Sequence, residues 1–430
     1  MPLETVDAAP RRIAVIGGGI SGMSAAHLLA RNASVVLYEG EGRLGGHART
    51  LLAGKRGDQP VDTGFIVFNK VNYPHLVQLF TDLAVPIADS SMTFGASLNG
   101  GRMEYALASV NALFATRTNL ANPRFYRMLR DIVHFNKTAE AAATDPTQTI
   151  GDLLGQLGTG DYFRDYYITP LSGAIWSTPV QGIMDFPAQA LIRFFKNHAL
   201  LGVYGQHQWY TVQGGSIEYV RRLQASLVTQ GVDLRLGAPI AGIKRVQGGA
   251  MVRAHGAEWE MFDEVVLATH SDTALRLLSD PTPAETAALS AVRYQANEAV
   301  LHADTSLMPK RRSCWASWVY CEPAGPKPDR IDLTYWMNSL QPIPQDDPLF
   351  VTLNSTQPIN QALIHDVNTF HHPVFDLPAI KAQATIRAMN GTGNTWFCGA
   401  WMRNGFHEDG FQSAVDVVDA MQSQQAPVAA

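Results

Sequence analysis

Three short apolar runs without polar alternation mark the chain at residues 13–16, 34–39 and 264–270. Such runs are typical of strands that are buried on both faces of a parallel sheet. The segment between the first two, "SGMSAAHLLARN", consists mainly of helix formers. The pattern therefore predicts a β-α-β unit at the start of the chain and a third buried strand far downstream.

The predicted type of secondary structure changes several times along the rest of the chain. Residues 73–205 read as mostly helical, with turn signals between amphipathic segments. Residues 212–236 predict a glycine turn, a helix and a strand, whereas 299–353 alternate in short runs that predict an antiparallel sheet. A strand, a glycine turn and a C-terminal helix are expected over residues 395–421.

A glycine cluster follows the first strand and has the spacing G-x-G-x-x-G, at Gly17, Gly19 and Gly22. The first glycine permits a tight strand-to-helix turn, the second lets the backbone approach a pyrophosphate, and the third lets the helix and strand pack closely. Ile20 and Ser21 begin the helix, whose free N–H groups and positive dipole end would face the phosphates.

Glu39 closes the second strand, where a carboxylate can accept hydrogen bonds from a ribose 2′-hydroxyl. The same carboxylate would repel a 2′-phosphate, so NADP is disfavoured in this unit. Strand, helix, second strand and acid together predict a site for an adenine dinucleotide, and the choice between nicotinamide and flavin falls to the residues that follow.

The next segment, "GEGRLGGHART", resembles the second glycine-rich turn of the flavin amine oxidase and phytoene desaturase superfamily. In that superfamily this turn and an arginine approach the FAD pyrophosphate. Arg43, Gly45 and Gly46 match the element, and His47 stands where many members have arginine. The resemblance implies non-covalent FAD, the amine-oxidase-like fold, and Arg43, Gly45, Gly46 and His47 as candidate cofactor-binding positions.

"VDTGFIVFN" resembles the Asp-x-Gly segment that passes beside the flavin in the same superfamily, with Asp62, Gly64 and Phe65 matching. The resemblance continues in three later segments, each of which implies further FAD contacts. They are the segment in which the chain returns to the FAD-binding domain, a strand that ends in small residues, and the C-terminal glycine turn. The candidate positions in those segments are Ile240, Thr269, Gly399, Trp401, Gly410 and Phe411.

The resemblance implies an α/β fold: a discontinuous Rossmann-like FAD-binding domain with a mixed α+β substrate domain. A chain of 430 residues also exceeds what one core usually supports. We expect the FAD-binding domain at residues 1–75, 206–290 and 385–430, and the substrate domain at 76–205 and 291–384.

Amine oxidases of the superfamily keep a lysine beside the flavin, on the first strand of the returning substrate domain. The corresponding stretch here, "RYQANEAVLHAD", has no lysine, and Glu298 or His302 occupies that neighbourhood. Glu298, His371 and His372 are therefore candidate catalytic residues, the histidines because imidazole titrates near neutral pH. The alternative for "FHHPVF" is a turn before Pro373 with a hydrogen-bonded imidazole.

The segments "LMPKRRSCWASW", "HHPVF" and "GFHEDGFQSA" resemble bacterial amine-oxidase-like flavoproteins associated with cyclopropane and branched fatty acid synthesis. That resemblance implies a fatty acyl substrate and oxidation or desaturation by hydride transfer to the flavin. Aromatic side chains of the substrate half would line an apolar tunnel or, alternatively, form ordinary core. They are Trp315, Trp318, Tyr320, Tyr335 and Trp336.

Two other functions remain open from the sequence. The first is oxidation of an amine or amino acid, although the missing lysine and Trp401, which stands where many amine oxidases have glutamate, disfavour it. The second is a flavin-binding accessory protein that assists a lipid-modifying enzyme. No metal site is predicted, because no carboxylate spacing supports His365 and its neighbours as ligands.

The composition limits the ligands and the cellular compartment that we expect for this chain. With 46% hydrophobic residues, 17% charged residues and a net charge of −5, the chain has no basic field for nucleic acid. Three cysteines at unpatterned spacing and a start without an apolar signal core predict a cytoplasmic protein, with Cys398 a small buried residue rather than a flavin link. Residues 186–205 predict a core helix or, alternatively, a surface helix in peripheral contact with the inner membrane.

Overall fold

A computed structural model describes residues 10–176, 180–198, 200–202, 207–325 and 331–424. The N-terminal β-α-β prediction is confirmed within a five-stranded sheet in which every neighbouring pair is parallel. The strand order is β10-β2-β1-β14-β20. These strands are β1 (Arg12–Ile16), β2 (Ser34–Tyr38), β10 (Asp233–Arg235), β14 (Glu264–Leu267) and β20 (Thr395–Phe397).

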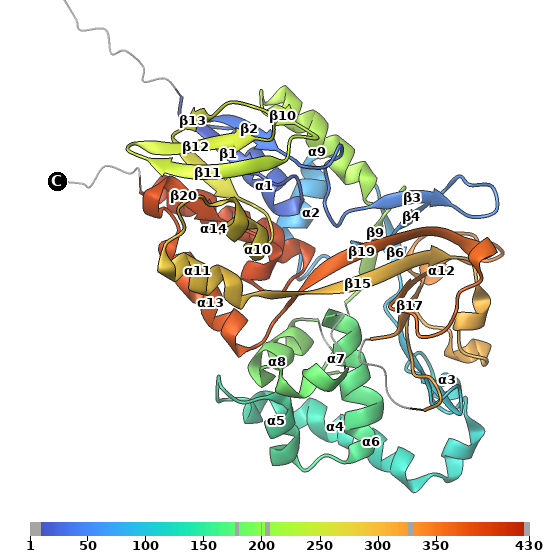
Figure 1. The fold of residues 1–430 in the computed structure, drawn as a ribbon. Helices are drawn as coiled ribbons and strands as arrows, with labels where there is room; N and C mark the ends of the chain where they lie inside the picture. Colours follow the sequence, from blue (N-terminus) through green and yellow to red (C-terminus); the bar gives the residue numbers. More distant parts are fainter. Residues whose placement is uncertain (1–9, 177–179, 199, 203–206, 326–330, 425–430) are drawn as a thin grey trace, which may run out of the picture.

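Helices cover one face of this sheet, and a small antiparallel sheet together with three further helices covers the other (Figure 1). The first layer contains α1 (Ile20–Leu29), α2 (Pro74–Asp82), α9 (Ile217–Thr229) and α14 (His407–Ser423). The second contains β11 (Ile240–Val246), β12 (Gly249–Ala254), β13 (Glu260–Phe262), α10 (Ser271–Leu277), α11 (Pro283–Ala291) and α13 (Leu377–Met389). Coverage of both faces explains why the parallel strands are continuous apolar runs.

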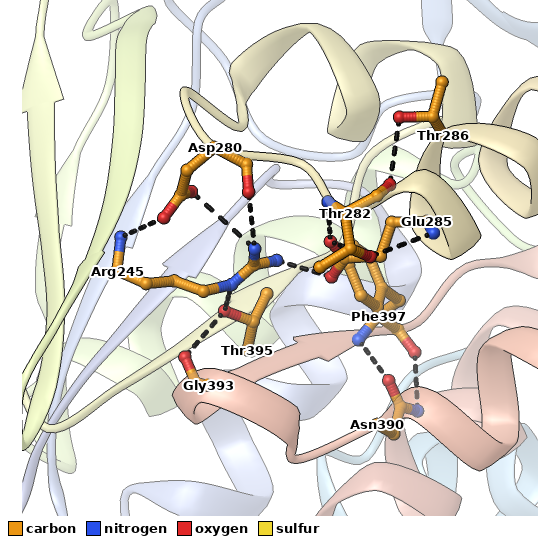
Figure 2. Close-up of polar contacts among 9 residues, drawn as sticks. All are labelled: Arg245, Asp280, Thr282, Glu285, Thr286, Asn390, Gly393, Thr395 and Phe397. Carbon is orange, nitrogen blue, oxygen red and sulfur yellow. Dashed lines mark hydrogen bonds and ion pairs between the residues drawn. The ribbon is translucent and has the colours of Figure 1, made fainter.

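Arg245 joins three of these elements at one point (Figure 2). Its guanidinium donates to the Asp280 carbonyl at 3.1 Å, to the Thr395 hydroxyl at 3.1 Å and to the carboxylate of Glu285. Glu285 is 4% exposed, so β11 holds α11 and the start of β20 through a largely buried ion pair.

A second, seven-stranded sheet has the order β19-β15-β18-β17-β16-β7-β8. Its strands are β7 (Phe94–Leu98), β8 (Met103–Ala106), β15 (Arg293–His302), β16 (Trp318–Cys321), β17 (Leu333–Trp336), β18 (Phe350–Leu353) and β19 (Ile364–Val374). The antiparallel sheet predicted over residues 299–353 is confirmed.

The prediction of a mostly helical segment at 73–205 holds for α2 at its start and was wrong for residues 87–106. Residues 87–106 contain β6 (Ile87–Ser90), β7 and β8, and β7 pairs in parallel with β16. The remaining short strands and α-helices are β3 (Thr50–Ala53), β4 (Gln59–Asp62), β5 (Val67–Asn69), β9 (Trp209–Val212), α3 (Val110–Leu113) and α12 (Met337–Leu340).

A helical layer packs below the seven-stranded sheet in Figure 1. It contains α4 (Pro123–Ala142), α5 (Ile150–Leu157), α6 (Asp161–Phe163), α7 (Thr169–Trp176) and α8 (Ala188–Asn197). The apolar face of α8 is buried in the core, as the core-helix interpretation of residues 186–205 expected, although residues 199 and 203–206 lie outside the described part. None of the described helices is both long and apolar enough to cross a membrane.

β15 and β19 form a long ribbon that crosses the middle of the molecule (Figure 1). The first half of β15 pairs only with β19, because β18 joins it from Ala299 onward. His371 and His372 lie within β19, so the alternative of a turn before Pro373 was wrong. The parallel sheet uses residues 12–38, 233–267 and 395–397, and we retain the predicted domain division as a proposal.

Candidate functional site

A cavity of about 620 Å³ opens where the carboxyl ends of the parallel strands meet the β15–β19 ribbon and the helical layer. Ligands of open α/β sheets bind at this edge, because the strand-to-helix turns present free backbone N–H groups there. The cavity is the larger of two pockets described for the chain, and it contains most of the candidate residues.

The first glycine turn forms one end of this cavity. An added Cβ on Gly19 would meet no atom within 4 Å, whereas one on Gly22 would lie 1.7 Å from the Gly17 carbonyl oxygen. Gly19 is also the N-cap of α1 and supplies no side chain to its free N–H groups. The turn therefore leaves an open approach for an anion at Gly19 and uses Gly22 for packing.

The Glu39 carboxylate lies beside this turn. It accepts the backbone N–H of Gly18 at 2.6 Å and that of Glu41 at 2.8 Å. These bonds hold the carboxylate at the cavity wall while leaving acceptor capacity on its oxygens. The position suits the ribose hydroxyl that the sequence predicted for it.

The second glycine turn closes against the first. Gly45 donates its N–H to the Gly18 carbonyl at 2.8 Å, and Gly46, with a φ of +54°, lies against the same turn. Arg43 does not line the cavity. Its guanidinium donates to the carbonyls of Gly46 at 3.1 Å and Ala48 at 3.2 Å, so it shapes this turn from behind.

Asp62 is fully buried below the cavity and does not line it. Its carboxylate accepts from the Ser216 N–H at 2.9 Å, from the Thr50 hydroxyl at 2.5 Å and from the Gln341 amide at 2.9 Å. Burial raises the pKa of Asp62 to about 6 despite these bonds. Asp62 thus joins β4 to the start of α9.

Phe65 and His407 form part of the cavity wall at the start of α14. Their rings stack at 3.9 Å, and the Tyr219 hydroxyl lies 2.6 Å from His407 Nε2. Burial lowers the pKa of His407 to about 3. Gly64 brings the chain close to His47, since an added Cβ would lie 2.1 Å from the His47 carbonyl oxygen.

A cluster of imidazole rings lines the centre of the cavity. His47 lies 5.7 Å from His372 and 5.9 Å from His270 between ring centroids, with Phe370 at 5.1 Å. Tyr294 stacks on His270 at 4.3 Å. Burial, and then the neighbouring imidazoles, lower the pKa of His47 to about 3 and that of His372 to about 4. These rings are neutral at physiological pH.

The far part of the cavity is apolar. Trp318 and Tyr335 line it, which fits the tunnel alternative, whereas Tyr320 is core and Trp315 and Trp336 pack against each other elsewhere. Glu39 is the only acidic residue among the described lining residues, and they include no lysine or arginine. The aliphatic and aromatic wall includes Met92, Ile175, Trp176, Phe194, Trp209, Leu353, Phe375 and Phe406.

The structure brings most predicted positions together at this cavity. Those that line it are Gly17, Gly19, Ile20, Ser21, Glu39, Gly45, Gly46, His47, Gly64, Phe65, Ile240, Thr269, His371, His372, Gly399 and Trp401.

Five predicted cofactor positions support the cavity without lining it, namely Gly22, Arg43, Asp62, Gly410 and Phe411. Gly410 packs on α1, and Phe411 stacks on His75 at 5.5 Å. Glu298 is exposed on β15 and lies outside the described cavity lining.

Sequence reasoning missed His270, Tyr294 and Phe370 as lining residues. His270 lies three residues after the end of the buried strand β14, and its place at a parallel strand's carboxyl end was a usable signal. All three cysteines are buried, and burial raises the pKa of Cys398 to about 12. The described residues contain no group of three His, Cys, Asp or Glu side chains suited to a metal.

Known proteins resemble this chain in two comparisons, one with family models and one with solved structures. The family model described as flavin containing amine oxidoreductase matches residues 20–312, more than half of the chain. No curated protein matches.

Solved structures share the fold along nearly the whole chain. A CLA-producing fatty acid isomerase from P. acnes superposes with a TM-score of 0.70 at 14% identity, covering 95% of this chain and 98% of that one. Cyclohexylamine oxidase from Brevibacterium oxydans IH-35A gives 0.69 at 14%, covering 96% and 100%. A redesigned putrescine oxidase also gives 0.69 at 14%, covering 97% and 100%.

The open backbone at Gly19, the free start of α1 and the Glu39 carboxylate fit an adenine dinucleotide, and the cavity continues past them to the imidazole cluster. The residues present therefore fit FAD. The chain belongs to the flavin containing amine oxidoreductase family and is an FAD-dependent oxidoreductase.

Proposed function

We propose that this oxidoreductase oxidises or desaturates an uncharged, apolar carbon chain such as the fatty acyl group of a lipid. One observation carries the proposal: beyond Glu39, the described cavity wall has no carboxylate, lysine or arginine, and its far part is aromatic and aliphatic. Apolar walls with few polar groups select ligands by the apolar area that they bury.

An amine substrate fits this wall poorly. A protonated amine loses its hydration on entering the cavity, which costs several kcal/mol unless a carboxylate replaces the water. Glu39 lies at the glycine turn with two backbone N–H groups already bound. The neutral imidazoles of the central cluster offer no compensating negative charge.

The chain's own residues have separable parts in the proposed reaction. The two glycine turns and the start of α1 would bind the FAD pyrophosphate, and Glu39 the ribose. The aromatic wall would hold a carbon chain close to the central cluster and exclude water. Bound FAD supplies the hydride acceptor.

Removing hydride to form a double bond also releases a proton. We assign the acceptance of that proton to His371, which lines the cavity and is exposed. Glu298 lies outside the cavity lining, and we give it no part in the reaction.

The experiment is an anaerobic mixing of the purified holoprotein with vesicles of unsaturated and saturated phospholipids and, separately, with putrescine and cyclohexylamine. Loss of oxidised-flavin absorbance with lipid alone is expected. Bleaching by the amines alone would overturn the proposal. A flavin that stays oxidised with every lipid, while the acyl chains of the lipids remain unchanged, would also overturn it. Migration of an acyl double bond without bleaching would keep the lipid substrate and replace oxidation by isomerisation.

Two tryptophans provide a matched pair for this experiment. Trp318 lines the cavity, whereas Trp315 packs away from it against Trp336. Trp318→Ala should raise the lipid concentration for half-maximal bleaching by about tenfold or more, because a large apolar contact is lost. Trp315→Ala should leave it unchanged, and equal effects of the two variants would contradict an acyl chain in this cavity.

A further inference from the structure

His372 is one member of the central imidazole cluster with a defined hydrogen-bond partner. Asn297 Nδ2 lies 2.9 Å from His372 Nδ1. The two residues lie on the β15–β19 ribbon, where His372 pairs with Gln295, two positions before Asn297 on the same face. Asn297 is fully buried and His372 lines the cavity, so the pair connects the interior of the ribbon with the cavity wall.

The direction of this hydrogen bond follows from a chain that begins at a backbone group. The Glu298 N–H, which can only donate, bonds to Asn354 Oδ1 at 3.0 Å. The other end of the Asn354 amide, Nδ2, therefore donates to Asn297 Oδ1 at 2.8 Å. Asn297 Nδ2 is then left to donate to His372, and its 3.4 Å approach to the Gln295 carbonyl requires the same orientation.

His372 Nδ1 is consequently an acceptor, and the ring proton of neutral imidazole sits on Nε2. A proton on Nδ1 as well would place two donors against each other in a buried site. The titratable groups facing the ring are other imidazoles, namely His47, His270 and His371. The described interactions of His372 contain no hydrogen bond from Nε2 to protein.

We propose that Asn354 and Asn297 fix His372 as a neutral imidazole whose Nε2–H donates to an acceptor atom of the molecule bound in the cavity. His372 is then a permanent hydrogen-bond donor and has no free nitrogen with which to take a proton. Asn297 and Asn354 are positioning residues, because they act through His372.

The acceptor is a carbonyl oxygen or a ring nitrogen, and two molecules that would bind in this cavity carry such atoms. The first is the flavin itself, and the second is the ester or amide carbonyl of an acyl substrate. The second assignment rests on the function proposed above. A protonated amine group is excluded from this point of the wall, because it too is only a donor.

The tautomer is tested directly with the full-length holoprotein labelled with ¹⁵N-histidine. The His372 signals are assigned as those lost in His372→Gln. We expect a protonated Nε2 and an unprotonated Nδ1, unchanged between about pH 5.5 and 8.5, because protonation would break the amide chain. In Asn297→Asp the new carboxylate accepts instead of donating, so the proton should appear on Nδ1. A protonated Nδ1 or a titration near pH 6.5 in the parent protein would overturn the proposal.

The source of the acceptor is tested with Asn297→Leu. The control is His365→Gln, which changes an exposed histidine on β19, the strand of His372. Binding of oleamide, an uncharged acyl carbonyl, is followed through the flavin spectrum. A changed flavin spectrum or midpoint potential without oleamide assigns the acceptor to the flavin. An unchanged flavin with a three- to tenfold weaker oleamide affinity, as expected for about one neutral hydrogen bond, assigns it to the substrate.

An Asn297→Leu protein with parental spectrum, potential and oleamide affinity would overturn the proposal that His372 donates to the bound molecule. If oleamide binds neither protein, the proposed lipid function fails, while the tautomer measurement and the flavin readings still decide the role of His372. The two failures are therefore distinguishable.

Discussion

Gly19 and Gly22 belong to one motif but differ in what surrounds them. Nothing lies within 4 Å of an added Cβ at Gly19, and its backbone has an ordinary extended conformation. Gly19→Ala should therefore leave the free energy of unfolding of the FAD-free protein unchanged or slightly higher. The new methyl group would stand where the pyrophosphate approaches, so FAD affinity should fall by tenfold or more in a fluorescence titration.

Gly22→Ala is the companion variant, since its Cβ would lie 1.7 Å from the Gly17 carbonyl oxygen. It should lower the urea midpoint of the FAD-free protein. A Gly19→Ala protein that unfolds early, or one that binds FAD normally, would contradict this account of the turn.

Glu39 gives a second prediction at this scale. Glu39→Ala removes a charged acceptor from the ribose position and also frees the N–H groups of Gly18 and Glu41. The loss of a hydrogen bond to a charged group, about 1.5–3 kcal/mol, corresponds to roughly 10- to 100-fold weaker FAD binding. Equilibrium dialysis measures this loss, with Glu41→Ala as a neighbouring acid that lies outside the cavity lining. Full FAD retention by Glu39→Ala would show that the ribose lies elsewhere.

The cavity-lining residues in the local glycine motifs were predictable because a few neighbouring positions define each turn. Asn297 and Asn354 were not, since they are 57 positions apart and become partners only when β15 and β18 pair. His372 was a candidate from its residue type alone. The direction of its hydrogen bond depends on three successive contacts that no spacing in the sequence contains.

At the scale of elements, substitution of Arg245 tests how β11 is joined to α11 and β20. Arg245→Met leaves the Glu285 carboxylate buried without its cation, which should cost about 3–5 kcal/mol of unfolding free energy. The double variant Arg245→Met/Glu285→Gln removes the unpaired charge and should be more stable than the single variant. Urea unfolding measures both. A double variant as unstable as the single one would show that the remaining contacts of Arg245 carry the stability.

Whether a strand could be predicted depended on the length of its apolar or alternating segment and on how far it is buried. The parallel strands are continuous apolar runs because both faces are covered, and the strands over residues 299–353 alternate in a recognisable way. The strands at 87–106 are four or five residues long, and β7 finds its parallel partner β16 more than 200 positions later. Helix formers in the surrounding segment therefore outweighed a pattern that only tertiary pairing makes significant.

For the whole molecule, the buried ionisable groups predict a loss of stability in mild acid. Five histidines have folded-state pKa values of about 3 or 4, below the ordinary value of 6.5, so the unfolded chain takes up their protons first. They are His47, His198, His302, His372 and His407. Their contribution is fully present above pH 6.5 and is lost as pH falls toward 4.

Three buried carboxyls act in the opposite direction, because their folded-state pKa of about 6 lets the folded protein bind protons first. These are Asp62, Asp332 and Asp409. Near pH 5, the protons that the histidines take up on unfolding exceed those that the carboxyls release by about two. Each such proton changes the free energy of unfolding by about 1.4 kcal/mol per pH unit. The urea midpoint should therefore be lower at about pH 5 than at pH 7.5. An equal or higher midpoint at the lower pH would contradict this balance.

The burial of all three cysteines has a practical consequence for studying the protein. Thiolate is the species that reacts with alkylating reagents, and burial raises the pKa of Cys314 to about 11 and that of Cys398 to about 12. The native thiols should therefore stay unlabelled under conditions that modify an exposed cysteine within minutes. A single cysteine introduced at Val110, which is 75% exposed, would then carry one spectroscopic probe on the unaltered native background.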